Sequence, residues 1–164
     1  MKFDITKIAN VIIYMIQKGV LHLNDKKLSI LLFLMDDSHL LDYDKKIFDD
    51  TYIKEKRHPE PKILSDLFDI MANDIDLDED DERIYLIAEL LDSLDIEVFN
   101  KKNFIEMKFV KRDEEFDKSL FDKEELKTID KIIERYKDAT ARKIANETFQ
   151  NKKVRAAKIG EVIF

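Results

Sequence analysis

Three histidines, His22, His39 and His58, are the side chains of this sequence that could serve as an imidazole base or an imidazole metal ligand. None of them has a carboxylate or a second histidine at a recognised metal-binding spacing. His39 comes just after Asp36 and Asp37, where a carboxylate could orient it as a general base. A histidine satisfied at the edge of the core is the favoured interpretation, and no catalytic residue is predicted.

Alternating aspartates resemble the ligand pattern of a calcium-binding loop. They are Asp74, Asp76, Asp78 and Asp80. The rest of the motif is missing, because counting from Asp74 places Glu79 at the sharp-turn glycine and Tyr85 at the bidentate acid. Counting from Asp76 places Asp81 and Ile87 there. We therefore predict a solvated acidic loop and no metal site.

Other common reactive motifs are excluded by composition. The two glycines, Gly19 and Gly160, cannot form a P-loop, a G-x-G-x-x-G turn or a G-x-S-x-G elbow. The absence of cysteine excludes disulfides, thiolate zinc sites and cysteine nucleophiles, and fits a reducing cytoplasm. With 36 acidic residues, close carboxylate pairs are expected everywhere and single out no acid/base dyad. No cofactor-binding residue is predicted.

Charge is distributed unevenly along the chain. The net charge of −7 divides into −12 over residues 1–126 and +5 over residues 127–164. The acidic body repels nucleic acid at long range and favours a basic protein partner. A small basic cluster near the C-terminal end consists of Lys152, Lys153, Arg155 and Lys158. This cluster could bind nucleic acid or an acidic protein, but a solvated helix face is favoured because no aromatic residues interleave with it.

The elements that must position these residues are mostly helical. Apolar residues recur at helical spacing over residues 5–16, 61–71, 81–94, 122–136 and 140–149, and the basic stretch 152–158 also favours a helix ending near Gly160. Asn24 is a good cap for a second helix that is apolar nearly all round over residues 28–35 and is expected to be buried. Pro61 suits the first turn of the third helix, and Asp122 with Glu125 forms a capping box.

Short extended segments complete the predicted fold. Residues 47–56 favour a two-stranded element before Pro59, and residues 97–110 favour a hairpin that turns near Asn100. The predicted fold class is mainly α (α+β), with six to seven helices and one or two small β-hairpins in a single domain over residues 1–164.

The location of the protein is predicted from what its N-terminal region and apolar runs lack. Asp4 precedes any apolar run, and no small-residue cleavage site follows residues 8–16, so a signal peptide is not expected. No apolar run reaches the roughly 20 residues that span a bilayer. A cytoplasmic protein without membrane contact is predicted, and no feature specifies its oligomeric state.

Several segments, in order, carry a resemblance to one family. Residues 27–33 read KLSILLF and are similar to a K-L-x-K-L-L-Y run, and residues 36–40 read DDSHL where the family has a charged residue and then H-L. Residues 51–54 and 57–61 are similar to the extended piece and the Y-G-P-V-P turn that precede a helix. The chain thus resembles the Panacea domain of SocA- and GepA-like antitoxins.

The resemblance extends to residues 121–136 and 139–141, which are similar to the capped penultimate helix and the short helix after it. Three positions depart from the family pattern: Ile30 stands in place of a lysine, His58 in place of a turn glycine, and Phe149 near the place of a histidine. The resemblance implies a mainly helical domain with a small sheet. It also implies an antitoxin that neutralises a toxin by direct protein binding, and some relatives hand the toxin to a protease as adaptors.

Four functions are compared. Antitoxin-like binding of a cognate toxin is the leading prediction, since masking a toxin needs area and complementary charge and no catalytic group. The alternatives are a nucleic-acid-binding regulator that uses the basic C-terminal cluster, or an interaction scaffold that has lost its toxin partner. An enzyme built around His39 is disfavoured, because it would require a pocket where His39 meets a carboxylate.

Overall fold

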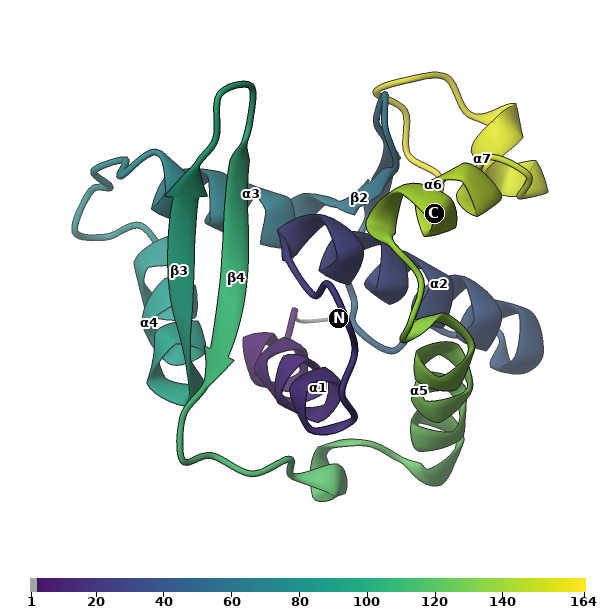
Figure 1. Cartoon of the computed structure of the whole chain (residues 1–164), viewed down its shortest axis with the longest axis horizontal. Coiled ribbons are helices and arrows are strands. Elements are labelled where there is room, and N and C mark those ends of the chain that lie inside the picture. Colours follow the sequence, from purple (N-terminus) through teal and green to yellow (C-terminus); the bar gives the residue numbers. More distant parts are fainter. Residues whose placement is uncertain (1–2) are drawn as a thin grey trace.

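The computed structural model describes residues 3–164, so Met1 and Lys2 of the predicted single domain lie outside the described residues. Within these residues the fold has seven α-helices, one short 3-10 helix and two antiparallel two-stranded sheets, which confirms the mainly helical α+β class (Figure 1). The α-helices are α1 Ile5–Gln17, α2 Asp25–Tyr43, α3 Lys62–Ala72, α4 Arg83–Ser93, α5 Lys123–Tyr136, α6 Ala141–Thr148 and α7 Lys152–Ala156. The remaining elements are β1 Tyr52–Lys54, β2 Pro59–Pro61, β3 Leu94–Asn100, β4 Ile105–Lys111 and the 3-10 helix η1 Lys118–Leu120.

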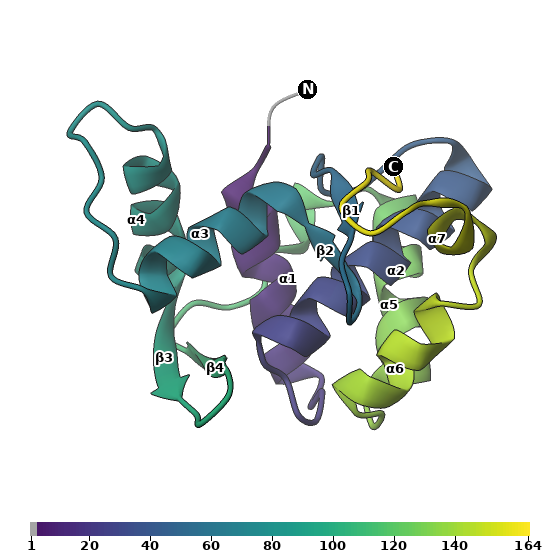
Figure 2. The same ribbon diagram turned by 90° about the horizontal axis from the view of Figure 1, so that it is seen from above.

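Helix α2 is the centre of the molecule. Figure 2 shows α1 and α2 between α3, α4 and the β3–β4 hairpin on one side and α5, α6 and α7 on the other. The prediction of a buried helix is confirmed, because every residue from Leu28 to Phe33 is buried and α2 packs against α5, α6, β2 and β4. The predicted cap is also present, since the side chain of Asn24 accepts a hydrogen bond of 2.9 Å from the backbone N–H of Lys27.

Helix α5 begins as predicted from its capping box. The Asp122 carboxylate accepts from the backbone N–H of Glu125 at 2.7 Å, and the Glu125 carboxylate accepts from the backbone N–H of Asp122 at 2.9 Å. The two bonds satisfy N–H groups that have no partner inside the helix. Helix α1 ends near Gly19, as its spacing predicted, and this glycine has φ +72°, a left-handed conformation that favours glycine.

Several element boundaries differ from those predicted. The two-stranded element predicted within residues 47–56, before Pro59, is instead β1 paired with β2, which starts at Pro59. Helix α3 begins after Pro61, and α4 begins at Arg83, whose backbone N–H donates to the Asp81 carboxylate at 3.0 Å. Strand β3 follows α4 directly and starts at Leu94, so the hairpin is longer than the predicted 97–110. Helix α7 ends at Ala156, well before Gly160, because the chain turns to pair with β1.

The C-terminal segment, residues 160–164, runs along β1 (Figure 2). The backbone N–H of Tyr52 donates to the carbonyl of Phe164 at 2.8 Å, and the N–H of Ile163 donates to the carbonyl of Tyr52 at 2.7 Å. The Phe164 ring packs against Phe33 and Tyr52 at centroid distances of 5.4 and 5.2 Å. A segment at the end of the sequence therefore completes the core over α2.

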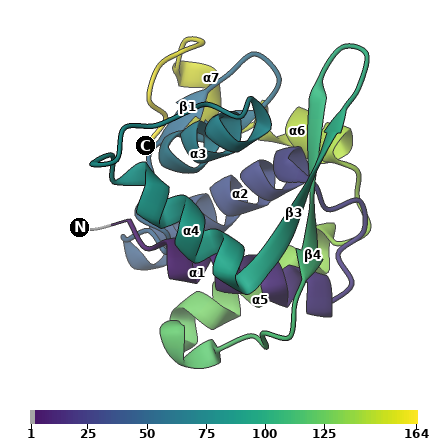
Figure 3. The same ribbon diagram turned by 90° about the vertical axis from the view of Figure 1, so that its left-hand side faces the viewer.

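The β3–β4 hairpin lies across α4 and beside α1, and its tip extends past the neighbouring helices (Figures 1 and 3). Strand β4 is anchored to the start of α2, because the backbone N–H of Met107 donates to Asp25 at 3.1 Å and Asn24 donates to Glu106 at 2.9 Å. Among residues 3–164, no helix is both long and apolar enough to cross a membrane.

Candidate binding surface

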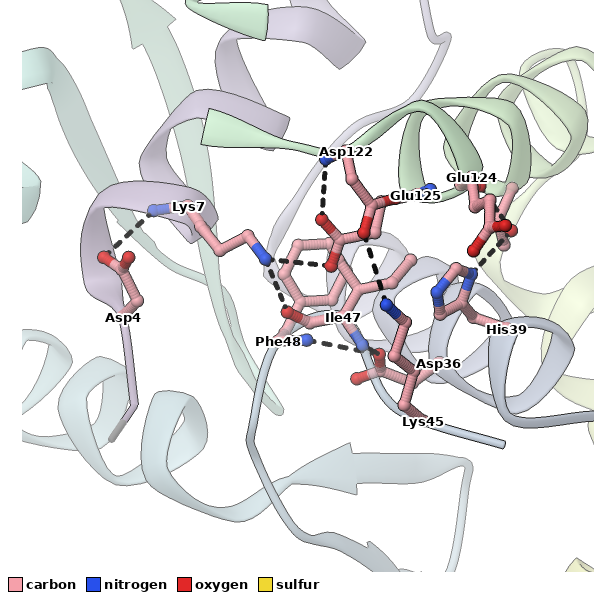
Figure 4. A network of polar contacts seen from close by, with 11 residues as sticks. Asp4, Lys7, Asp36, His39, Lys45, Ile47, Phe48, Asp122, Glu124 and Glu125 are labelled. Carbon is pink, nitrogen blue, oxygen red and sulfur yellow. Dashed lines mark hydrogen bonds and ion pairs between the residues drawn. The ribbon is translucent and has the colours of Figure 1, made fainter. Parts of the chain in front are cut away.

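The three histidines lie apart, and none of them forms a general-base arrangement. His22 is exposed in the turn after α1, and His58 lies in the β1–β2 turn, where its Nδ1 is 3.0 Å from the Pro59 carbonyl oxygen. His39 is fully buried, deeper than the predicted core edge, and its Nδ1 contacts the Thr128 hydroxyl at 2.9 Å (Figure 4). Its Nε2 has no hydrogen-bond partner among residues 3–164. The arrangement is that of a core histidine.

Asp36, beside His39 on α2, organises the loop between α2 and β1. Its buried carboxylate accepts from the backbone N–H groups of Ile47 and Phe48 at 2.6 and 3.3 Å (Figure 4), and from the Tyr52 hydroxyl at 2.5 Å. Burial raises the pKa of Asp36 to about 6, although these hydrogen bonds favour its ionised form. Because all three donors are buried groups of the protein, two backbone N–H groups and one tyrosine hydroxyl, Asp36 has a structural role.

A partly buried ion pair joins α1 to α5. The Lys7 ammonium donates to Glu125 and to the Ile47 carbonyl, each at 3.0 Å, while Lys45 donates to Asp122 at 3.3 Å nearer the surface (Figure 4). Glu125 thus serves the capping box and the ion pair together. This network fixes the start of α5 against α1 and the α2–β1 loop.

The acidic and basic clusters lie on separate parts of the fold. Asp74, Asp76, Asp78 and Asp80 are exposed in the α3–α4 loop. Across the residues that the structure describes, no group of three or more His, Asp or Glu side chains is placed to hold a metal ion. In the basic cluster, Lys153 pairs with Asp37 at 2.9 Å, which neutralises one of its four charges.

A hollow lies between α2, the β1–β2 turn and α6, and we name it the cationic hollow. It has a volume of about 580 Å³. Ala145 and Phe149 at α6 form an apolar floor, behind which Ile30 of α2 is fully buried. Figures 1 and 2 place the β1–β2 hairpin beside α6, so residues far apart in the sequence meet here.

Four cations surround this floor. They are Lys26 on α2, Lys56 and Arg57 on the β1–β2 turn, and Arg142 on α6. None of the four forms an ion pair within residues 3–164, and no acidic side chain lines the hollow. Lys26 is placed by its contact with the Phe104 ring, 3.7 Å from its Nζ to the ring centroid. Sequence reasoning missed this set, because its members come from three separate elements.

A smaller hollow of about 330 Å³ adjoins it on the other side of the β1–β2 turn, and we name it the acidic hollow. Asp25, Glu55, Glu60 and Asp69 line it. Burial raises the pKa of Glu60 to about 7, and the carboxylates of Glu55, Asp69 and Asp25 add to this. The two hollows share Lys26, Lys56, Arg57 and His58, so cations and carboxylates lie side by side at this turn, and Arg142 is the cation that lines the cationic hollow alone.

Replacing Glu60 with glutamine is expected to stabilise the protein at pH 8 and to have little effect at pH 4. The folded state raises the pKa of Glu60 from 4.5 to about 7, so its favourable contribution is complete below pH 4.5 and is lost as the pH rises through 7. Because the side chain is partly exposed, we expect a gain of about 1 kcal/mol, or roughly 3 °C in Tm. Thermal unfolding at both pH values measures it. The exposed Glu114→Gln is the control, and an equal gain at pH 4 would contradict the explanation.

Most of the chain matches one known protein family. Residues 28–153, most of the chain, match the family described as "Antitoxin SocA-like, Panacea domain". The chain belongs to this family. No curated protein and no solved structure matches it.

Several residues that carry the resemblance to the Panacea domain are buried and structural. Lys27 is fully buried, and its ammonium donates to the carbonyls of Leu21 and Lys137. Asp36 holds the α2–β1 loop, and the Asp122–Glu125 box begins α5. In this chain each of these side chains satisfies backbone groups that have no partner within their own helix or loop.

The three departures from the Panacea pattern meet in one place. Ile30, His58 and Phe149 all line the cationic hollow. His58 does not have a positive φ, so replacing the turn glycine imposes no backbone strain here. Burial lowers the pKa of His58, and the nearby Lys26 and Arg57 add to this effect. The fold of the family is therefore kept, while the lining of this hollow differs from the family pattern.

Proposed function

We propose that this protein is an antitoxin that neutralises a cognate toxin by binding it directly. The match to the SocA-like Panacea family over residues 28–153 carries the proposal. The net charge of −7 supports it, because an acidic surface complements the basic surface of a toxin that acts on RNA or on the translation machinery. We also propose that residues 1–164 act as one cytoplasmic domain and that neutralisation uses no catalytic side chain.

Co-expression with the product of the neighbouring gene tests this function. We expect growth to recover when the full chain is expressed with that protein, and the two proteins to co-purify as a complex. The acidic surface makes the complex sensitive to salt, so its Kd should rise between about 0.05 and 0.5 M NaCl. Failure to restore growth, together with the absence of a complex, would contradict the proposal.

The protease-adaptor route predicts a further observation. If the protein delivers the toxin to a protease, the half-life of the toxin falls when the antitoxin is present, and toxicity returns when the protease is removed. If binding alone neutralises the toxin, its half-life is unchanged or longer. We propose binding alone, since masking requires only an interface. A pulse-chase measurement of the toxin separates the two routes.

The nucleic-acid alternative has a distinct signature. Regulation through the basic cluster would give duplex DNA binding that falls steeply with salt and weakens when Lys152 and Arg155 are replaced by alanine. The pairing of Lys153 with Asp37 lowers the charge available to phosphate, and the acidic body opposes approach. We therefore expect no duplex binding at 0.15 M salt, which an electrophoretic mobility assay measures.

A further inference from the structure

The cationic hollow is lined by positive side chains, whereas the protein as a whole is negatively charged. Lys26, Lys56, Arg57 and Arg142 surround it without an acidic neighbour in its lining, in a chain whose net charge is −7. Their side chains form no ion pair with any residue in the described range 3–164. Four cations around one concave site make it locally positive, and such a site attracts anions. The charge therefore indicates an anionic occupant.

The floor of the hollow adds a second requirement. Phe149 and Ala145 border this space and Ile30 is fully buried behind them, so apolar side chains line the hollow together with the four cations. A volume of about 580 Å³ accommodates a large aromatic or aliphatic side chain. An occupant that combines an apolar side chain with flanking carboxylates satisfies both the floor and the rim. Arginine also suits carboxylates well, because its planar donors can bond both oxygens.

The adjoining acidic hollow limits the length of an anionic occupant. Asp25, Glu55, Glu60 and Asp69 lie across the β1–β2 turn, and any polyanion that continued past the turn would meet them. A nucleic acid carries charge at every nucleotide and would be repelled there. A short acidic stretch of a protein can end at the turn, or can continue with basic residues that pair with the acidic hollow. The arrangement thus favours a protein segment.

We propose that the cationic hollow is the docking site for an acidic segment of the toxin that inserts one large apolar side chain against Phe149. This inference rests on the proposed function, since it takes the bound partner to be the neutralised toxin. It assigns the contact to one site of the antitoxin and a chemical class to the toxin segment. It also gives the departure from the family pattern at Phe149 a role in partner choice.

Charge reversal at the rim tests the docking site in the full chain. We expect Arg57→Glu combined with Arg142→Glu to weaken binding of the neighbouring gene product by ~30-fold or more at 0.15 M NaCl. Both side chains are exposed, so the fold should tolerate the change. The matched control is Lys152→Glu combined with Lys158→Glu, two exposed basic residues outside the hollow, with an expected change of less than about 3-fold. Isothermal titration calorimetry measures both.

A peptide assay separates this inference from the proposed function. The probe is a fluorescein-labelled peptide with one tryptophan flanked by glutamates, and the matched peptides carry alanine for the tryptophan or lysines for the glutamates. We expect binding only of the first peptide, and we expect this binding to be lost in the double rim variant.

If the neighbouring gene product binds the protein but rim reversal has no effect, the docking site is wrong and the function stands. If no complex forms with that product, the function fails and the peptide result alone decides the site. Binding of a 12-nucleotide RNA to the hollow in place of the peptide would overturn the inference.

Discussion

Replacing Asp36 with alanine is expected to destabilise the protein by about 3 kcal/mol at pH 7. The substitution removes the acceptor of two backbone N–H groups, those of Ile47 and Phe48, which have no other partner in the α2–β1 loop. Each buried donor left unsatisfied costs about 1–3 kcal/mol, partly offset because a buried charge is also removed. The Tyr52 hydroxyl retains a second acceptor, the Leu32 carbonyl at 3.1 Å. Urea unfolding followed by circular dichroism should show a midpoint lower by about 1.5 M.

The asparagine variant separates hydrogen bonding from charge. Asp36→Asn keeps an oxygen for the two N–H groups, and its amide N–H can donate to Tyr52 while the Tyr52 hydroxyl donates to Leu32. We expect this variant to lie within about 1 kcal/mol of the parent at pH 4, where both side chains are neutral. The control is Asp42→Ala on the same helix, because Asp42 pairs with Lys131 at the exposed surface and its loss should cost about 1 kcal/mol or less. Equal losses for Asn and Ala would contradict a hydrogen-bonding role.

The difference in stability between the parent and the Asp36→Asn variant should change as the pH rises. Folding raises the pKa of Asp36 from 3.8 to about 6, so the contribution of this group is complete below pH 3.8 and is lost as the pH passes through 6. The parent must ionise a buried carboxyl over this interval and the asparagine variant does not. The variant should therefore gain on the parent by up to about 3 kcal/mol between pH 4 and pH 7.

Local signals in the sequence predicted local structure well. Asn24 caps α2, and Asp122 with Glu125 caps α5, because these side chains bond to backbone groups only three residues away. The apolar run of α2 predicted burial for a similar reason, since a helix that is apolar on all sides needs neighbours on all sides. The fold class and the family followed from such short-range patterns.

Contacts between distant residues were the part that sequence patterns could not supply. Asp50 caps α3 by accepting from the backbone N–H groups of Ile63 and Leu64 at 2.9 and 3.1 Å, although it lies 13 and 14 residues away. Residues 160–164 pair with β1, which lies far away in the sequence, and no periodicity in the sequence indicates this pairing. The cationic hollow has the same origin: Arg57 and Arg142 are ordinary exposed cations in the sequence, and only the fold brings them to one rim.

Lys27 is the second position where we expect a large loss of stability. Its side chain is fully buried, and its ammonium donates to the Leu21 carbonyl at 2.5 Å and the Lys137 carbonyl at 3.0 Å. Lys137 follows the last residue of α5, so the cation lies where the helix dipole favours positive charge. Lys27→Ala should destabilise the protein by about 3 kcal/mol, since it leaves a cavity and removes both bonds.

Replacing Lys27 with methionine separates the cost of the lost hydrogen bonds from the cost of the cavity. Lys27→Met keeps most of the buried stem and removes the ammonium, which leaves the Leu21 carbonyl without its donor while Lys137 still accepts from the Leu21 N–H at 2.8 Å. We expect a loss of about 1–2 kcal/mol in urea unfolding, roughly half that of alanine. The control is Lys26→Ala on the preceding residue, whose ammonium lies over Phe104 and whose loss should cost less than about 1 kcal/mol. A methionine variant as stable as the parent would mean that the hydrogen bonds of the buried ammonium contribute nothing to stability. The recurrence of lysine at this position of the family motif would then need a role in binding and not in folding.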